Sequence, residues 1–230
     1  MRRDSGTAED SPRLEAVIFD MDGVIADTEP FHAHAYVEVF KRFGIRVSKK
    51  EYRKAITEDG KTTATWFVQL GGDPEMIDDV YKQKDQIYFP LLKKRGSPRP
   101  GLFSLLSDLQ GSGVACALAT SARGVNSRFI LDLFELKEFF TVSLALEDVT
   151  HPKPHPDVFL LALKRLSAHP KRTVVLEDAP KGVRAAFDAG IPVVAVRTPW
   201  TRHYRFDGAS LVVDSLEELS VERLTSLLPT

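Results

Sequence analysis

The sequence contains six short apolar segments that have the length of β-strands. They lie at residues Ala16–Phe19, 114–119, 142–146, 173–176, Val193–Val196 and Leu211–Val213. Most of them lack the alternation of polar and apolar residues that is typical of a strand covered on one face only. They therefore indicate strands that are covered on both faces, as in a parallel sheet between two layers of helices.

Segments with helical periodicity separate most of the predicted strands. They lie at residues 102–109, 125–134, 158–166 and 182–189, and a further helical pattern covers residues 215–228. Strands that alternate with helices predict βαβ units. We therefore expect an α/β protein with an open, mainly parallel sheet.

Residues 28–95 are different, because no convincing strand segment occurs there. Helix start and stop signals divide this part instead, among them Ser48 and Glu51, which fit a capping box. We expect an all-helical domain inserted into the α/β domain, with the two connecting segments at one junction. The predicted domains are residues 28–95 for the insert, and residues 1–27 with 96–230 for the core.

Four side chains of the insert receive structural predictions. Trp66 and Phe67 lie in a short predicted helix and are expected in the hydrophobic core of the insert. Lys61 and Lys84 are expected to be solvated, as most lysines are.

Polar residues follow the apolar segments at the points where the predicted strands end. Because ligands bind beyond the carboxyl ends of the strands in open α/β sheets, these side chains are candidates for one common site. They are Asp20 and Asp22, Thr120 and Ser121, Glu177 and Asp178, together with Lys153 in a proline-rich loop.

These residues together predict phosphoryl chemistry. Converging carboxylates repel one another unless a cation lies among them, and oxygen ligands suit Mg²⁺. A metal ion, a lysine and a hydroxyl group form a binding site for a phosphate dianion. Asp20 can then attack phosphorus and form an aspartyl phosphate, and Asp22 can act as general acid and base. We expect neighbouring anionic groups to raise the pKa of Asp22, so that it holds a proton near neutral pH.

The same residues resemble the four motifs of the haloacid dehalogenase-like hydrolase superfamily, and they occur in the family order. Each residue alone would suit a turn or a helix cap, but the combination is specific. The matching residues are 20–28 (Asp-Met-Asp-Gly-Val-Ile-Ala-Asp-Thr), Thr120, Lys153 with Pro154, and Glu177-Asp178 with Gly182.

The resemblance implies a Rossmann-like three-layer core with a helical cap domain. It implies Asp20 as the nucleophile and Asp22 as the acid and base. It further implies Mg²⁺ bound by Asp20, the backbone carbonyl of Asp22 and Asp178, with Glu177 close by. Thr120 and the backbone amides of Met21 and Ser121 would hold the phosphate, and Lys153 would neutralise its charge. True dehalogenases of this superfamily lack the second aspartate of the first motif, so Asp22 favours phosphoryl chemistry.

Within the superfamily, the sequence resembles the β-phosphoglucomutase and sugar-phosphate phosphatase branch. His32 matches a histidine that lines the cleft between cap and core in those enzymes. Mutases carry a cap arginine that grips a distal phosphate, whereas residues 57–61 of this chain contain no arginine. We therefore expect a phosphatase that acts on a small phosphorylated metabolite, with a sugar phosphate as the best candidate and β-phosphoglucomutase as the alternative.

Two further classes of protein are weaker alternatives. A phospho-receiver module also places acidic residues, a hydroxyl and a lysine at strand ends, but such modules lack a large helical insert. A cap-containing protein that has lost its activity would not need the complete set of motifs.

Composition excludes several other classes. Lys and Arg (31) nearly balance Asp and Glu (32), which argues against a general nucleic-acid or membrane-surface binder. The single cysteine, Cys116, excludes an internal disulfide and is expected to be buried. No apolar run is long enough to span a bilayer, and residues 1–13 do not resemble a signal peptide. We expect a cytoplasmic monomer.

Overall fold

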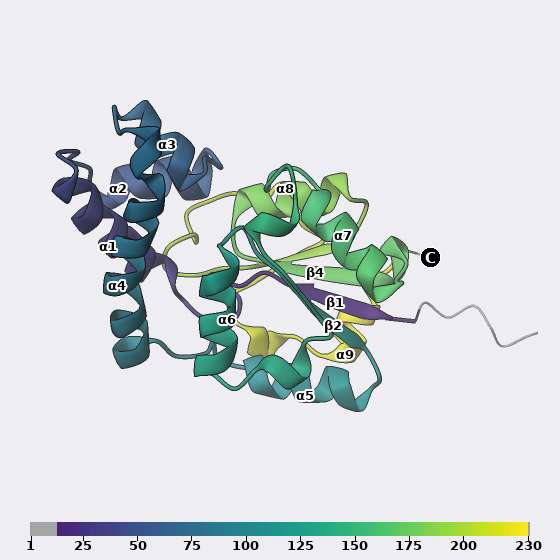
Figure 1. Cartoon of the computed structure of the whole chain (residues 1–230). Coiled ribbons are helices and arrows are strands. Elements are labelled where there is room, and N and C mark those ends of the chain that lie inside the picture. Colours follow the sequence, from purple (N-terminus) through teal and green to yellow (C-terminus); the bar gives the residue numbers. More distant parts are fainter. Residues whose placement is uncertain (1–12, 230) are drawn as a thin grey trace, which may run out of the picture.

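Six strands form one sheet in the computed structural model of the chain, which describes residues 13–229 (Figure 1). Every neighbouring pair is parallel, and the order across the sheet is β3-β2-β1-β4-β5-β6. The strands are β1 (Ala16–Phe19), β2 (Ala115–Ala119), β3 (Val142–Leu144), β4 (Thr173–Glu177), β5 (Val193–Val196) and β6 (Leu211–Val213). Residues 1–12, for which the sequence predicts no signal peptide, and residue 230 lie outside the described residues.

The register of the central strands brings their carboxyl ends to one level. Phe19 of β1 is paired with Leu118 of β2 and with Leu176 of β4. The next residue of each chain segment is Asp20, Ala119 and Glu177, so these three positions emerge at the same edge of the sheet. The polar residues predicted to share a site therefore begin from neighbouring strands.

Helices cover both faces of the sheet, and alternate strand residues pack against the two layers. Val17 and Phe19 belong to the hydrophobic cluster on one face, whereas Ile18 belongs to the cluster on the other. On the first face lie α5 (Leu102–Gly111), α6 (Gly124–Leu133) and α9 (Val221–Thr225), and on the second lie α7 (Asp157–Leu166) and α8 (Pro180–Asp188). Burial on both faces explains why the strands lack polar alternation.

This arrangement confirms the predicted fold class, a parallel Rossmann-like α/β core with a helical insert. The prediction of one helix over residues 215–228 is wrong. A short 3₁₀ turn, Leu216–Glu218, precedes α9, because Ser215 and Ser220 each cap a new helical segment with the side-chain oxygen.

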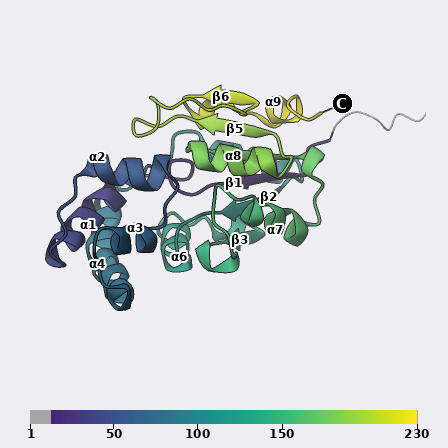
Figure 2. The same ribbon diagram turned by 90° about the horizontal axis from the view of Figure 1, so that it is seen from above.

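The insert between β1 and α5 is helical, as Figures 1 and 2 show at one end of the sheet. Its elements are α1 (Glu29–Arg42), α2 (Lys49–Tyr52), a π-helical segment (Arg53–Glu58), α3 (Thr63–Gln69), a 3₁₀ turn (Pro74–Met76) and α4 (Ile77–Arg95). The predicted capping box of Ser48 and Glu51 is confirmed at the start of α2. Trp66 and Phe67 lie, as expected, in a separate hydrophobic cluster of the insert with Tyr36 and Phe40.

The two segments that connect the insert to the core lie side by side. Ala26 forms an antiparallel bridge with Pro98, and the amide of Arg99 donates a hydrogen bond to the carbonyl of Ile25 at 2.8 Å. The chain therefore enters and leaves the insert at the same place. The division into domains at residues 28–95 stays a prediction.

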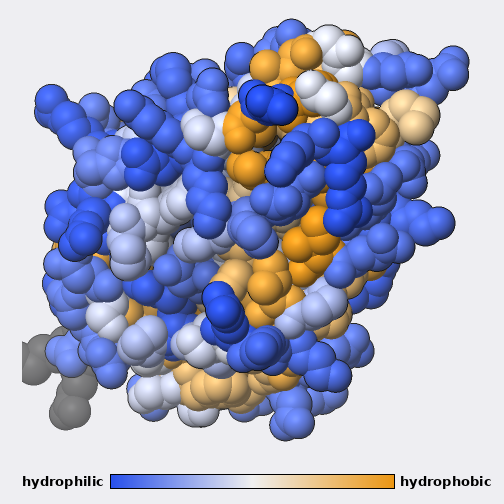
Figure 3. Space-filling model, turned by 90° about the vertical axis from the view of Figure 1, so that its left-hand side faces the viewer, coloured by the Kyte–Doolittle hydropathy of each residue, from blue (hydrophilic) through white to orange (hydrophobic). Residues whose placement is uncertain are grey.

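The outer face of the insert is mostly hydrophilic, with a band of apolar side chains across it (Figure 3). Exposed apolar residues of the insert include Val68, Leu70 and Met76. Among residues 13–229, no helix combines the length and the apolar composition that are needed to cross a membrane.

Cys116 provides a test of the core. Its side chain on β2 is buried, and burial raises the pKa of the thiol to about 12. The thiol is therefore protonated near neutral pH and inaccessible to reagents. We expect the native protein to release almost no thionitrobenzoate from Ellman's reagent, and the unfolded protein in guanidinium chloride to release one equivalent. Rapid reaction of the native protein would contradict the described position of β2.

Candidate active site

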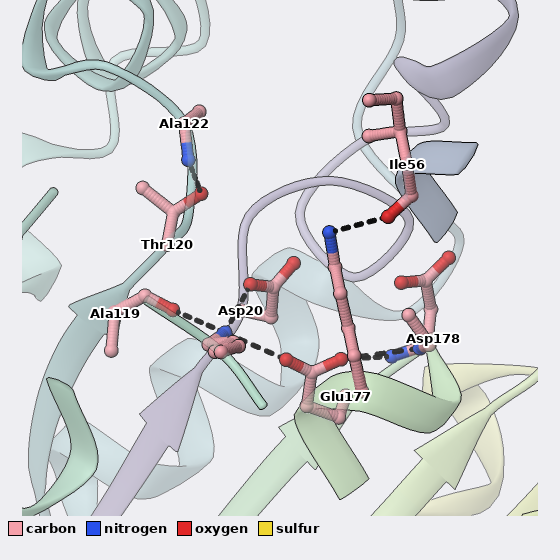
Figure 4. A network of polar contacts seen from close by, with 10 residues as sticks. Asp20, Ile56, Ala119, Thr120, Ala122, Glu177 and Asp178 are labelled. Carbon is pink, nitrogen blue, oxygen red and sulfur yellow. Dashed lines mark hydrogen bonds and ion pairs between the residues drawn. The ribbon is translucent and has the colours of Figure 1, made fainter. Parts of the chain in front are cut away.

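Asp20, at the carboxyl end of β1, takes part in a buried ionic network (Figure 4). The Nζ atom of Lys153 donates hydrogen bonds to Asp20 Oδ1 at 2.5 Å, to Glu177 Oε1 at 2.6 Å and to the carbonyl of Ala119 at 2.9 Å. Burial lowers the pKa of Lys153, but the charges of Asp20 and Glu177 raise it more, to above its usual value. Lys153 is thus a fixed cation between two carboxylates.

Glu177 also shapes the turn between β4 and α8. Its Oε2 atom accepts hydrogen bonds from the backbone amides of Asp178 at 3.0 Å and Ala179 at 3.1 Å. Gly182 allows this arrangement, because a Cβ atom there would lie 1.8 Å from Glu177 Oε1. The match of Gly182 to the fourth motif therefore has a steric explanation.

Asp20, Glu177 and Asp178 form a group that fits a divalent cation. One carboxylate oxygen of each lies within 4.8 Å of the others, and all three residues are buried. Asp178 Oδ2 is a buried acceptor for which the described residues supply no hydrogen-bond donor. Burial raises the pKa of Asp178 well above its usual value, and repulsion from Glu177 and Asp20 adds to this effect. Burial raises the pKa of Asp20 to about 8, although Lys153 opposes the change. A hard cation would stabilise these carboxylates in their charged forms.

Asp22 lines the same cavity as this acidic group and contacts two residues of the first part of the insert. The hydroxyl of Thr28 donates a hydrogen bond to Asp22 Oδ1, and His32 Nε2 lies 3.3 Å from the same oxygen. Burial alone would raise the pKa of Asp22, but the nearby His32 imidazole and the hydrogen bond from Thr28 lower it below the usual value. The prediction that neighbouring anions raise this pKa is therefore wrong for this arrangement, because Thr28 and His32 at Asp22 Oδ1 outweigh burial and the nearby carboxylates.

Behind His32, the structure corrects the prediction for Lys84. Lys84 is fully buried rather than solvated, and its Nζ atom lies 2.6 Å from Asp85 Oδ1 and donates to Asn126 Oδ1 at 3.2 Å. The centre of the Tyr88 ring lies 4.3 Å from Lys84 Nζ and 4.0 Å from the centre of the His32 ring. No sequence motif links Lys84 with Asp85, Asn126 and Tyr88, so the sequence alone did not indicate that Lys84 is buried.

The predicted phosphate-binding residues lie next to the acidic group. Thr120 is buried, and its hydroxyl accepts a hydrogen bond from the amide of Ala122 at 3.0 Å, whereas the hydroxyl of Ser121 is buried without a partner among the described residues. The side chain of Met21 packs in the core of the sheet. A cavity of about 300 Å³ is lined by Asp20, Asp22, Glu29, Thr120, Ser121, Lys153, Glu177, Asp178, Ala179 and Lys181.

A second cavity, of about 660 Å³, lies between the core and the insert and shares Asp22 and Lys153 with the first. His32 lines it, as do residues 60–63 of the insert. Two residues that sequence analysis missed, Glu29 and Lys181, line both cavities. Burial raises the pKa of Glu29 to about 7, and repulsion from Asp22 contributes. Glu29 is the first residue of α1, so its place in the sequence fits a helix start and does not by itself indicate a residue of the cavity.

Comparisons with known proteins agree with this geometry. Residues 17–196 match the family model described as haloacid dehalogenase-like hydrolase. The chain is 33% identical to protein CbbY of Cereibacter sphaeroides, over 90% of this chain and 94% of that protein. It is 32% identical to the phosphorylated carbohydrates phosphatase of Thermotoga maritima, over 77% of this chain and 82% of the relative.

Solved structures share the fold. The crystal structure of a CbbY variant from Rhodobacter sphaeroides in complex with xylulose 1,5-bisphosphate has a TM-score of 0.84 and 32% identity, and the match covers 92% of this chain and 99% of that one. The chain therefore belongs to the haloacid dehalogenase-like hydrolase family. Another relative is the fructose-1-phosphate phosphatase YqaB of Escherichia coli, which is 31% identical over 80% of this chain and 97% of that protein.

Gly23 tests the position of Asp178. Gly23 has a φ of +86°, and a Cβ atom there would lie 2.1 Å from Asp178 Oδ2. We expect Gly23→Ala to displace Asp178 and to lower turnover of a phosphate monoester by about 100-fold or more, the scale of a lost transition-state contact. Steady-state kinetics of the purified variant measure this change.

Gly71→Ala is the matched control. Gly71 has nearly the same φ, +88°, but a Cβ atom there would meet no other atom of the described residues within 4 Å. This control carries the same backbone strain of about 1–2 kcal/mol and should keep its activity. Equal activity of the two variants would contradict the contact between Gly23 and Asp178.

Proposed function

We propose that this chain is a Mg²⁺-dependent phosphatase that hydrolyses a small phosphorylated metabolite, with sugar phosphates as the substrate class. The observation that carries the proposal is the buried group of Asp20, Glu177, Asp178 and Lys153 beside a cavity with hydroxyl donors. The phosphatase from Thermotoga maritima, whose name specifies phosphorylated carbohydrates, supports the substrate class.

In the proposed reaction, a carboxylate oxygen of Asp20 attacks the phosphorus atom, the ester P–O bond breaks, and an aspartyl phosphate forms. Water then attacks the phosphorus, which releases inorganic phosphate and restores the Asp20 carboxylate. Lys153 is within hydrogen-bond distance of Asp20 and offsets negative charge at this point. Ser121, with its unpartnered buried hydroxyl, and Thr120 supply polar contacts for the phosphate oxygens.

Asp20, Asp178 and the carbonyl of Asp22 are the residues that would hold Mg²⁺, with Glu177 adjacent. The ion would neutralise charge on the carboxylates and on the phosphate oxygens. The unpartnered Asp178 Oδ2 supports this assignment, as do the pKa values of Asp178 and Asp20, which burial raises, because a bound cation would stabilise the charged carboxylates that burial disfavours.

Asp22 is the proposed general acid and base. It protonates the leaving alkoxide and later takes a proton from the attacking water. Before substrate binds, Thr28 and His32 favour its charged form. The phosphate dianion of a substrate adds negative charge beside Asp22, which raises its pKa and allows it to bring a proton to the leaving group.

Phosphomutase activity is the alternative within the same chemistry. Residues 60–63 of the insert line the larger cavity and supply Lys61 but no arginine. Arg123 of the core also lines this cavity, but its guanidinium lies 3.6 Å from Asp85 and 3.9 Å from Glu147. This favours hydrolysis over transfer to a second sugar hydroxyl. Incubation with glucose 1-phosphate and a bisphosphate primer separates the two activities, and faster formation of glucose 6-phosphate than of free phosphate would overturn the preference.

A screen of phosphorylated metabolites tests the proposed function. With Mg²⁺ present, we expect release of phosphate from at least one sugar phosphate, and EDTA should abolish it. Asp20→Asn should reduce turnover to below about 1%, because an amide cannot act as the nucleophile. Retention of more than a few per cent of activity would reject Asp20 as the nucleophile, and no hydrolysis of any monoester would reject the function.

The role of Asp22 predicts a dependence on the leaving group. Asp22→Asn should slow hydrolysis of alkyl esters by about 100-fold or more but affect nitrophenyl esters less, because nitrophenolate needs little protonation. Single-turnover rates for the two esters measure the difference. Equal slowing of both would contradict the acid role.

A further inference from the structure

A rigid turn follows β5 and presents Trp200 to the insert. The hydroxyl of Thr198 accepts hydrogen bonds from the amides of Trp200 and Thr201, each at 3.1 Å. The hydroxyl of Thr201 accepts one from the amide of Thr198 at 3.2 Å, and both threonines are buried. These bonds fix the backbone that carries the indole.

Trp200 contacts the π-helical segment of the insert. Its Nε1 atom donates a hydrogen bond to the hydroxyl of Thr57 at 3.2 Å, and Thr57 is 1% exposed. The guanidinium of Arg53 lies 5.6 Å from the centre of the indole ring. Among the core residues that the structure describes, only Trp200 packs against the hydrophobic cluster of the insert.

A second core residue contacts the neighbouring position of the same segment. Lys181 of α8 donates a hydrogen bond from Nζ to the carbonyl of Ile56 at 3.0 Å (Figure 4). Two core elements therefore hold consecutive residues, Ile56 and Thr57. Such π-helical segments occur frequently at functional sites, and this one is held directly by the core.

The π-helical segment leads into the residues that line the larger cavity. The amide of Lys61 donates to the carbonyl of Ala55 at 2.9 Å, so the path of the loop depends on the position of the segment. Gly60, Lys61, Thr62 and Thr63 then line the cavity of about 660 Å³. A shift of residues 56 and 57 would therefore move these lining residues but leave the position of Asp20 unchanged.

We propose that Trp200 is a positioning residue that sets substrate selectivity. By holding Thr57, it fixes residues 60–63 over the part of a substrate that extends beyond the phosphate. Trp200 lines neither cavity, so it acts through the insert rather than on the reacting atoms. This inference rests on the proposed function, because it concerns selection among phosphate esters.

Two substrates and two single variants test the proposal. Trp200→Phe removes the N–H donor and keeps an aromatic ring, and Thr57→Val removes the acceptor. For the best sugar phosphate of the screen, we expect either variant to raise KM by about threefold to tenfold, the scale of one buried hydrogen bond. For acetyl phosphate, whose leaving group has only two carbons, kcat and KM should stay within about twofold. Unchanged KM for the sugar phosphate, or equal increases for both substrates, would overturn the proposal.

A double variant and a conservative variant complete the test. Trp200→Phe with Thr57→Val should raise KM no more than either single change, because both remove the same hydrogen bond. Thr57→Ser keeps a hydroxyl and should restore KM to near that of the unsubstituted protein. Additive effects of the two substitutions, or failure of Thr57→Ser to restore KM, would reject the hydrogen bond as the cause.

Fluorescence tests the contact without catalysis. The sequence has two tryptophans, so Trp66→Phe leaves Trp200 as the single emitter. Adding Thr57→Val should increase acrylamide quenching of Trp200, because the partly buried indole loses the hydrogen bond that holds it against the insert. Unchanged quenching would overturn the proposal. Failure of the proposed function would be visible separately, as absence of hydrolysis by the unsubstituted protein.

Discussion

The balance of charge at the end of β1 determines what this molecule can do. Asp20, Glu177 and Asp178 are buried together. The ammonium group of Lys153 donates hydrogen bonds to Asp20 and Glu177. Buried carboxylates without enough positive charge are costly, and the raised pKa values of Asp20 and Asp178 express that cost. The site is therefore built to receive positive charge, and the proposed Mg²⁺ would supply it.

The parallel sheet makes this concentration of charge possible. Apolar strands covered on both faces form a rigid support, and their equal register delivers side chains from β1, β2 and β4 to one edge. The turn after β4 is then held by Glu177 and packed against Gly182. Local backbone hydrogen bonds and side-chain packing thus keep like charges close together.

Sequence patterns predicted the six strands and the helical insert, because both depend on local periodicity. Motifs predicted the family of the chain and the acidic residues of the candidate site. They failed where a property depends on which side chains the fold brings into contact. The burial of Lys84 requires Asn126 and Tyr88, the lowered pKa of Asp22 requires His32 and Thr28, and the contact of Trp200 with Thr57 joins positions 143 residues apart. The helix expected over residues 215–228 failed for a local reason, since Ser220 starts a new segment.

The separate hydrophobic cluster of the insert has an evolutionary consequence. Trp66, Phe67 and Phe40 stabilise the insert from within, and its two connections to the core meet at one bridge between Ala26 and Pro98. Substitutions in its cavity-facing loop can therefore accumulate while the acidic edge of the sheet stays intact. Descendants of one ancestral chain can acquire new preferences among esters and inherit the same bond-breaking chemistry.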